Sequence, residues 1–115
     1  MENGQSNRKM RTVVITGASR GIGAATAMLA GKSGYAVVVN YLSNKEGAEV
    51  VANEIERQGS KAYVVQADIS KPNEIKQLFD WVDREVGPIY GLVNNAGILE
   101  TQMRFDEMED TRLSR

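Results

Sequence analysis

Three glycines separate an apolar run from a helix-prone stretch near the start of the chain. Gly17, Gly21 and Gly23 follow the apolar residues 13–15 and precede residues 24–30. In an α/β fold, one such glycine makes a tight turn, one lets the backbone approach a phosphate, and one lets the helix pack close to the strand. The first turn of the helix favours an anion, because its N–H groups are unpaired and the positive end of its dipole lies there. The spacing predicts a diphosphate-binding loop, and the alternative is a glycine-rich turn without a ligand.

The order of these residues, T-G-x-x-x-G-x-G over 16–23, differs from the common G-x-G-x-x-G, whose last glycine would fall on Thr26. A second short motif, N-N-A-G, occupies residues 94–97. Together the two motifs resemble those of the short-chain dehydrogenases/reductases, and the resemblance runs from Arg11 onward. Residues 38–41 and 66–70 are similar to those of members called 3-oxoacyl-carrier-protein reductases and glucose 1-dehydrogenases.

Strand and helix patterns alternate along the rest of the chain. Apolar runs predict strands at 11–16, 35–39, 62–65 and 89–93, and helical spacing predicts helices between them that end near Gly34, Gly59 and Gly87. Such alternation gives a Rossmann-type, doubly wound parallel sheet in a three-layer α/β/α fold, with strand order 3-2-1-4 and a second half missing. We expect residues 1–10 to be a flexible lead-in and 11–115 to form the nucleotide-binding domain.

Composition excludes several classes of protein. The 115 residues contain neither Cys nor His, which leaves no thiol, imidazole or disulfide, so we expect no metal site and no hydrolase triad. A formal charge of −1 argues against a nucleic-acid binder. No long apolar segment predicts a membrane span or a signal peptide. We expect a cytoplasmic protein.

The end of the second strand should decide which dinucleotide binds. An acidic residue there would accept hydrogen bonds from the ribose and repel a 2′-phosphate, but this chain has Asn40. Arg20 can supply positive charge to that phosphate, with Ser43 and Lys45 as possible helpers. These residues favour NADP over NAD, and Asn40→Asp should reverse the preference. The alternative is that Arg20 is a solvated loop charge and Asn40 a turn residue.

The resemblance also implies roles at the ends of the third and fourth strands. Asp68 would bind the adenine with help from the Ile69 N–H. Independently of the resemblance, the position of Ser70 before Lys71 and Pro72 predicts that it caps the following helix. Residues 94–97 would pass under the cofactor ribose and brace the first strand through Thr16. The cofactor-binding residues expected in this chain are Gly17, Ser19, Arg20, Gly21, Ile22, Gly23, Asn40, Tyr41, Ser43, Asp68, Ile69, Asn94, Ala96 and Gly97.

Members of the resembled family use a Tyr-x-x-x-Lys pair on a helix after a fifth strand, a Ser upstream of that pair and an Asn on the helix after the fourth strand, and we assign no catalytic residue in this chain. The string from Tyr41 to Lys45 fits the pair by coincidence, because Tyr41 continues a strand and the two side chains share no helix face. The chain stops at Arg115, inside the helix expected after the fourth strand. The resemblance implies the cofactor half of an NADP-dependent oxidoreductase acting on a small alcohol or carbonyl compound. The alternative is a nucleotide-binding module without catalysis.

The fourth strand should lie inside a complete sheet, so in this chain Leu92 and Val93 are expected at an uncovered edge. The helix surface around Met28 and Leu29 is expected to lack a packing partner as well. Exposed apolar surface promotes pairing with another chain. We therefore expect this chain to self-associate and its parent protein to be a homo-oligomer.

Overall fold

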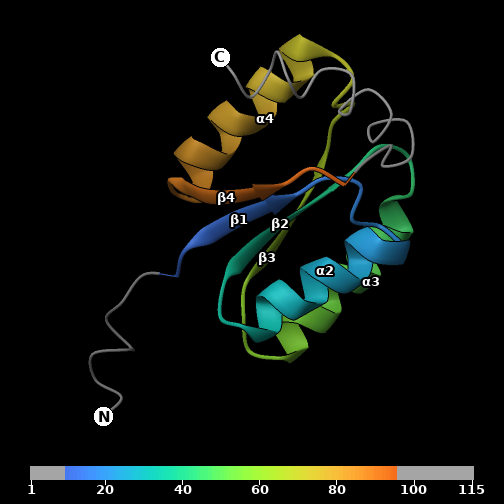
Figure 1. The fold of residues 1–115 in the computed structure, drawn as a ribbon, viewed down its shortest axis with the longest axis vertical. Helices are drawn as coiled ribbons and strands as arrows, with labels where there is room; N and C mark the ends of the chain where they lie inside the picture. Colours follow the sequence, from blue (N-terminus) through green and yellow to red (C-terminus); the bar gives the residue numbers. More distant parts are fainter. Residues whose placement is uncertain (1–9, 96–115) are drawn as a thin grey trace, which may run out of the picture.

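A four-stranded parallel sheet with helices on both faces forms the molecule in the computed structural model, which describes residues 10–95 (Figure 1). The strand order is β3-β2-β1-β4, so the predicted fold class and strand order are confirmed. The strands are β1 (Thr12–Ile15), β2 (Ala36–Tyr41), β3 (Ala62–Gln66) and β4 (Ile89–Val93). The helices between them are α2 (Gly21–Lys32), α3 (Lys45–Arg57) and α4 (Pro72–Glu85).

Two apolar cores lie on opposite faces of the sheet, because side chains alternate along each strand. Val13 and Ile15 of β1 pack with residues of α2 and α3, whereas Val14 packs with Leu78 and Val82 of α4. Figure 1 shows the same division, with α2 and α3 on one side and α4 on the other. The central strand β2 is buried along its whole length, as expected for a continuous apolar run in a parallel sheet.

Small residues bring α2 close to its neighbours. The buried face of this helix consists of Gly23, Ala24, Ala27 and Gly31. A Cβ placed on Gly31 would lie 2.7 Å from the Cγ2 of Ile55 in α3, which is too close for a side chain. The pair of helices therefore packs at a distance that only glycine allows at this position.

Strand β4 is irregular where it begins. Thr12 lies opposite Ile89 and Val13 lies opposite Gly91, so Tyr90 is an extra residue in the ladder, as in a β-bulge. The Tyr90 ring stacks on Tyr35 with 6.0 Å between ring centroids, and the guanidinium of Arg11 lies 4.5 Å from the Tyr90 centroid.

The outer edge of β4 pairs with no other strand in the part of the chain that is described. Leu92 is 49% exposed and Val93 is 40% exposed, as expected for this edge. On α2, Leu29 is exposed as expected, but the expectation for Met28 was wrong. Met28 is half-buried and packs against the core between α2, α3 and the sheet.

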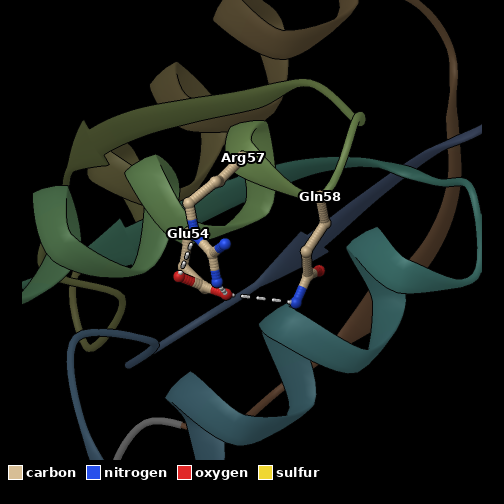
Figure 2. A network of polar contacts seen from close by, with 3 residues as sticks. All are labelled: Glu54, Arg57 and Gln58. Carbon is tan, nitrogen blue, oxygen red and sulfur yellow. Dashed lines mark hydrogen bonds and ion pairs between the residues drawn. The ribbon is translucent and has the colours of Figure 1, made fainter.

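A polar network closes the last turn of α3 (Figure 2). The Arg57 Nε donates to Glu54 Oε1 at 3.0 Å, its Nη2 donates to Glu54 Oε2, and the Gln58 amide reaches the same carboxylate. The hydrogen bonds from Arg57 lower the pKa of Glu54 below its usual value. Because the network is exposed, it orders the helix end and contributes little to stability.

The strands begin and end within two residues of the predicted positions, and each helix ends within two residues of its predicted glycine, whereas α2 begins at Gly21, three residues before the helix-prone stretch 24–30. β1 is shorter than expected at both ends, and β2 extends beyond the apolar run 35–39 to Tyr41, which was expected to continue the strand. Such shifts are normal because the last residues of an element have few partners. Residues 1–9 and 96–115 lie outside the described part, so the expected lead-in and the helix after β4 stay predictions.

Candidate functional site

The glycine loop connects β1 to α2 at the carboxyl end of the sheet. Gly17 has φ 58° and Gly21 has φ 64°, in the left-handed region that glycine adopts without strain. A Cβ on Gly21 would meet no atom within 4 Å, so the space above it is open. Ser19 is half-buried, while Arg20 and Ile22 project outward, with Ile22 67% exposed.

The third glycine packs against the loop that precedes it. A Cβ on Gly23 would lie 2.3 Å from the Gly17 carbonyl oxygen and 2.4 Å from the Asn95 Nδ2. Gly23 is thus closely packed, but against the glycine loop and Asn95, whereas the sequence pattern predicted close packing of the helix against the strand. Gly47 has a similar role that the sequence reasoning missed, because its Cβ would lie 2.5 Å from the Ser19 carbonyl oxygen. The first turn of α3 thus supports the glycine loop from the side.

The first turn of α2 carries no counter-charge of its own. Arg20 occupies the N-cap position without a capping hydrogen bond from its side chain, and no acidic residue follows in the first turn. By contrast, α3 is capped by Asn44, whose Oδ1 accepts from the Gly47 N–H, and α4 has Glu74 in its first turn. Among the three described helices, only α2 lacks both devices. Its N–H groups and the adjacent guanidinium therefore suit an anionic ligand.

The residues at the end of β2 differ in where their side chains lie. Asn40 is 1% exposed and Tyr41 is buried in the core on the α2 face, whereas Ser43 is exposed on the loop. The Asn40 amide makes its hydrogen bonds inside the protein, with Gly17, Val65 and Ala67. Sequence reasoning placed Asn40 beside the cofactor ribose, but the structure directs its side chain into the fold.

The loop after β3 is organised around Asp68. Its Oδ1 accepts from the Ser70 N–H at 3.0 Å and from the Ser70 hydroxyl at 2.6 Å, and these bonds lower the Asp68 pKa. The expectation that Ser70 caps α4 was wrong, because Lys71 occupies the N-cap position. Glu74 instead reaches back to accept from the Asp68 N–H at 2.7 Å. Ile69 is half-buried beside this turn.

The residues after β4 brace the glycine loop as predicted. The Thr16 hydroxyl donates to Asn94 Oδ1 at 3.1 Å and accepts from the Asn95 N–H at 2.7 Å. In addition, the Asn95 Nδ2 donates to the Gly17 carbonyl at 3.2 Å, a contact that the sequence reasoning did not include. The remaining two residues of the predicted motif, Ala96 and Gly97, lie outside the described residues.

Three loops therefore meet at the carboxyl edge of the sheet, where ligands bind in open α/β folds. These loops follow β1, β2 and β4, and Asn95 joins the last of them to the glycine loop. Asn40 at the end of β2 also bonds to Gly17 in the glycine loop and to Ala67 after β3. The residues fit the diphosphate of a nucleotide, since an open space over Gly21 adjoins an uncapped helix start.

Residues 10–95 contain neither a candidate metal site nor a candidate membrane span. Within this range, no cluster of three or more His, Cys, Asp or Glu side chains could hold a metal ion. No helix there has the length and apolar character needed to span a membrane.

Comparisons with known proteins find relatives of this chain. The uncharacterized oxidoreductase YgfF of Escherichia coli K12 is 45% identical over 106 residues, covering 92% of this chain and 43% of YgfF. The 3-oxoacyl-[acyl-carrier-protein] reductase FabG of Staphylococcus epidermidis is 40% identical over 101 residues, covering 86% of this chain and 41% of FabG. The chain thus spans about two fifths of the length of these relatives.

A solved structure shares both fold and sequence with the described part. The landomycin C-6 ketoreductase LanV, solved with bound NADP and rabelomycin, superposes with a TM-score of 0.69 at 36% identity, covering 78% of this chain and 39% of LanV. The family model for short chain dehydrogenases matches residues 11–115. Because that match covers nearly the whole sequence, the chain belongs to the short-chain dehydrogenase family and corresponds to its N-terminal, cofactor-binding part.

Proposed function

We propose that this chain is the NADP-binding part of an oxidoreductase that transfers hydride between the cofactor and a small alcohol or carbonyl substrate. The observation that carries the proposal is the start of α2, where an uncapped first turn without acidic residues follows an exposed arginine. The N–H groups of residues 21–23 would hold the diphosphate. The bound NADP in LanV supports the choice of dinucleotide.

Arg20 is the residue proposed to recognise the 2′-phosphate. Its guanidinium is exposed beside the glycine loop, and the salt bridges found within residues 10–95 all involve other residues. Ser43 is exposed on the loop after β2 and would offer a hydroxyl to the same group. Lys45, at the start of α3, adds a second exposed positive charge. These groups bind a doubly charged phosphate more strongly than a ribose hydroxyl, because hydrogen bonds between opposite charges are stronger than hydrogen bonds to a neutral group.

The adenosine half would lie between the glycine loop and the loop after β3. Asp68 and Ile69 are proposed to contact the adenine, and Asn94, Ala96 and Gly97 to line the ribose. The cofactor, when bound, supplies or accepts the hydride, and the residues of this chain hold it in place. No catalytic role is proposed for Tyr41, because its ring is buried in β2 whereas Lys45 belongs to the first turn of α3.

Binding measurements on the 115-residue chain test this function. Isothermal titration calorimetry should show tighter binding of NADPH than of NADH. Arg20→Ala should remove one charge-assisted contact of about 1.5–3 kcal/mol, which weakens NADPH binding about 10- to 100-fold and leaves NADH binding nearly unchanged.

Lys32→Ala is the matched control, because Lys32 is an exposed cation at the opposite end of the same helix. It changes the net charge equally and should leave both affinities unchanged. Equal affinities of the unsubstituted chain for NADPH and NADH would contradict the assignment of Arg20. Absence of binding to either dinucleotide would contradict the proposed function itself.

Self-association forms a separate part of the proposal. The outer edge of β4, which pairs with no strand within residues 10–95, exposes Tyr90, Leu92 and Val93. The segment from Gly87 to Asn95 contains no charged residue that would oppose pairing with a second copy. We therefore expect this chain to form oligomers through that edge and the whole protein to be a homo-oligomer.

That the protein acts in the cytoplasm also stays a prediction, which fractionation of expressing cells would test.

A further inference from the structure

Asn40 is a polar side chain buried in a strand made mostly of aliphatic residues. It lies next to last in β2 and is 1% exposed, and the other large side chains that are fully buried in the described part are all Val or Ile. An amide removed from water is costly unless its hydrogen bonds are satisfied. The contacts that satisfy it therefore indicate what the residue does.

Hydrogen bonds from this residue reach two different loops. Asn40 Oδ1 accepts from the Gly17 N–H at 3.2 Å, and its main-chain oxygen accepts from the Ala18 N–H at 2.8 Å. The Asn40 Nδ2 donates to the carbonyl oxygens of Val65 at 3.2 Å and Ala67 at 3.3 Å. One amide thus joins the glycine loop to the end of β3, one residue before Asp68.

The arrangement requires both an acceptor and donors on the same side chain. Rotating the amide by half a turn would set its oxygen against two carbonyl oxygens and its nitrogen against an N–H group. A carboxylate would keep the acceptor for Gly17 but would place negative charge against the oxygens of Val65 and Ala67. The sequence analysis expected Asn40→Asp to shift the cofactor preference toward NAD. The structure leads to a different expectation, because the substitution removes the hydrogen bonds to Val65 and Ala67 and so the contact between the two loops.

We propose that Asn40 is a positioning residue that holds the glycine loop and the loop after β3 in register, so that the nucleotide meets a preformed surface on both sides. This inference rests on the proposed function. Residues that are already ordered lose less conformational freedom on binding. When the amide is absent, only a fraction of molecules has both loops in place, and the apparent affinity falls by that fraction.

The test compares three variants of the 115-residue chain by NADPH titration, thermal unfolding and amide hydrogen exchange measured by NMR. Asn40→Ser shortens the side chain, so that it loses both the contact with the Gly17 N–H and the reach to β3. Asn40→Asp keeps the acceptor for Gly17 and loses both donors. Val38→Ala is the control, because Val38 is a fully buried residue of the same strand without a polar side chain, so its truncation destabilises the fold and removes no hydrogen bond to either loop.

Both Asn40 variants should bind NADPH about tenfold or more weakly than the unsubstituted chain, since net hydrogen-bond contributions of this size are lost. The folded Val38→Ala chain should keep its affinity within about twofold, although its melting temperature also falls. In Asn40→Ser without nucleotide, exchange at the Gly17 and Ala18 amides should accelerate relative to Val38→Ala. In Asn40→Asp the Gly17 amide should remain protected while NADPH binding is still weakened.

A purely structural role would lower the melting temperature of Asn40→Ser and leave its NADPH affinity equal to that of Val38→Ala, and this result would overturn the proposal. Unchanged exchange at Gly17 in Asn40→Ser would overturn it as well, whether or not nucleotide binds. If Asn40→Asp does not fold, Asn40→Ser decides the outcome alone. If the unsubstituted chain binds neither NADPH nor ADP, the proposed function fails, and the exchange measurements still decide whether Asn40 fixes the loops.

Discussion

Replacing Gly23 by alanine should disrupt the glycine loop through a single methyl group. The new Cβ would lie 2.3 Å from the Gly17 carbonyl oxygen and 2.4 Å from Asn95 Nδ2, both far inside contact distance. Gly17 has little room to retreat, because Asn40 binds its N–H and Asn95 binds its carbonyl. The methyl group therefore either breaks the bond from Asn95 or pushes α2 away from the loop.

The size of the effect follows from three contributions. Overpacking costs about 1–3 kcal/mol, and loss of the bond between Asn95 and Gly17 costs about 0.5–1.5 kcal/mol. Alanine in place of glycine within a helix stabilises the folded state by about 1 kcal/mol, because alanine has the higher helix propensity. The net destabilisation is about 1–3 kcal/mol, and each kcal/mol lowers the melting temperature of a domain of this size by about 4–8 °C.

Thermal unfolding followed by circular dichroism measures this change. Gly91→Ala is the matched control, because its Cβ would meet only the Val13 Cγ1, at an ordinary contact distance of 3.5 Å. That variant should melt at or slightly above the temperature of the unsubstituted chain. A Gly23→Ala chain that melts no lower than the control and still binds NADPH would refute the close packing described for Gly23.

Three further outcomes are expected. Because the pKa of Asp68 is lowered in the folded state, its carboxylate stabilises the fold above its unfolded pKa, near 3.8, and this contribution is lost as the pH falls through the lower folded pKa. Urea unfolding across this pH range should show that Ser70→Ala loses less unfolding free energy in acid than the unsubstituted chain does. Identical pH profiles would contradict the role of Ser70. Leu92→Lys should shift light scattering of the chain toward the monomer, whereas an unsubstituted chain that is monomeric at all concentrations would argue against association through β4. The 115-residue chain should not oxidise NADPH with a carbonyl substrate, and turnover abolished by Tyr41→Phe would show that the Tyr41 and Lys45 pair had been dismissed wrongly.

The sequence predicted the sheet well because its signals are local. A glycine pattern between an apolar run and a helix, and a continuous apolar run in β2, each have few structural solutions. The bonds from Thr16 to the residues after β4 were also predictable, since parallel strands bring their carboxyl ends to one edge of the sheet.

The direction of a polar side chain at a strand end was less predictable. An asparagine at this position is compatible with a side chain that contacts the cofactor ribose and with one that makes hydrogen bonds inside the protein. Only the positions of Val65 and Ala67 distinguish these two possibilities. Ser70 was similar, because a serine before a helix is a normal N-cap. Here the chain enters α4 one residue later, and the hydroxyl binds Asp68 instead. Both outcomes depend on partners brought together by tertiary structure.

The bulge at Tyr90 separates the two ends of β4. Ile89 pairs with Thr12 before the bulge and Gly91 pairs with Val13 after it, so the ladder would run without interruption if Tyr90 were deleted. Val93 would remain opposite Ile15, and the asparagines that follow would still reach Thr16. The start of this strand can therefore lose one residue, together with the ring stacked on Tyr35, without changing the register in which its far end meets the glycine loop.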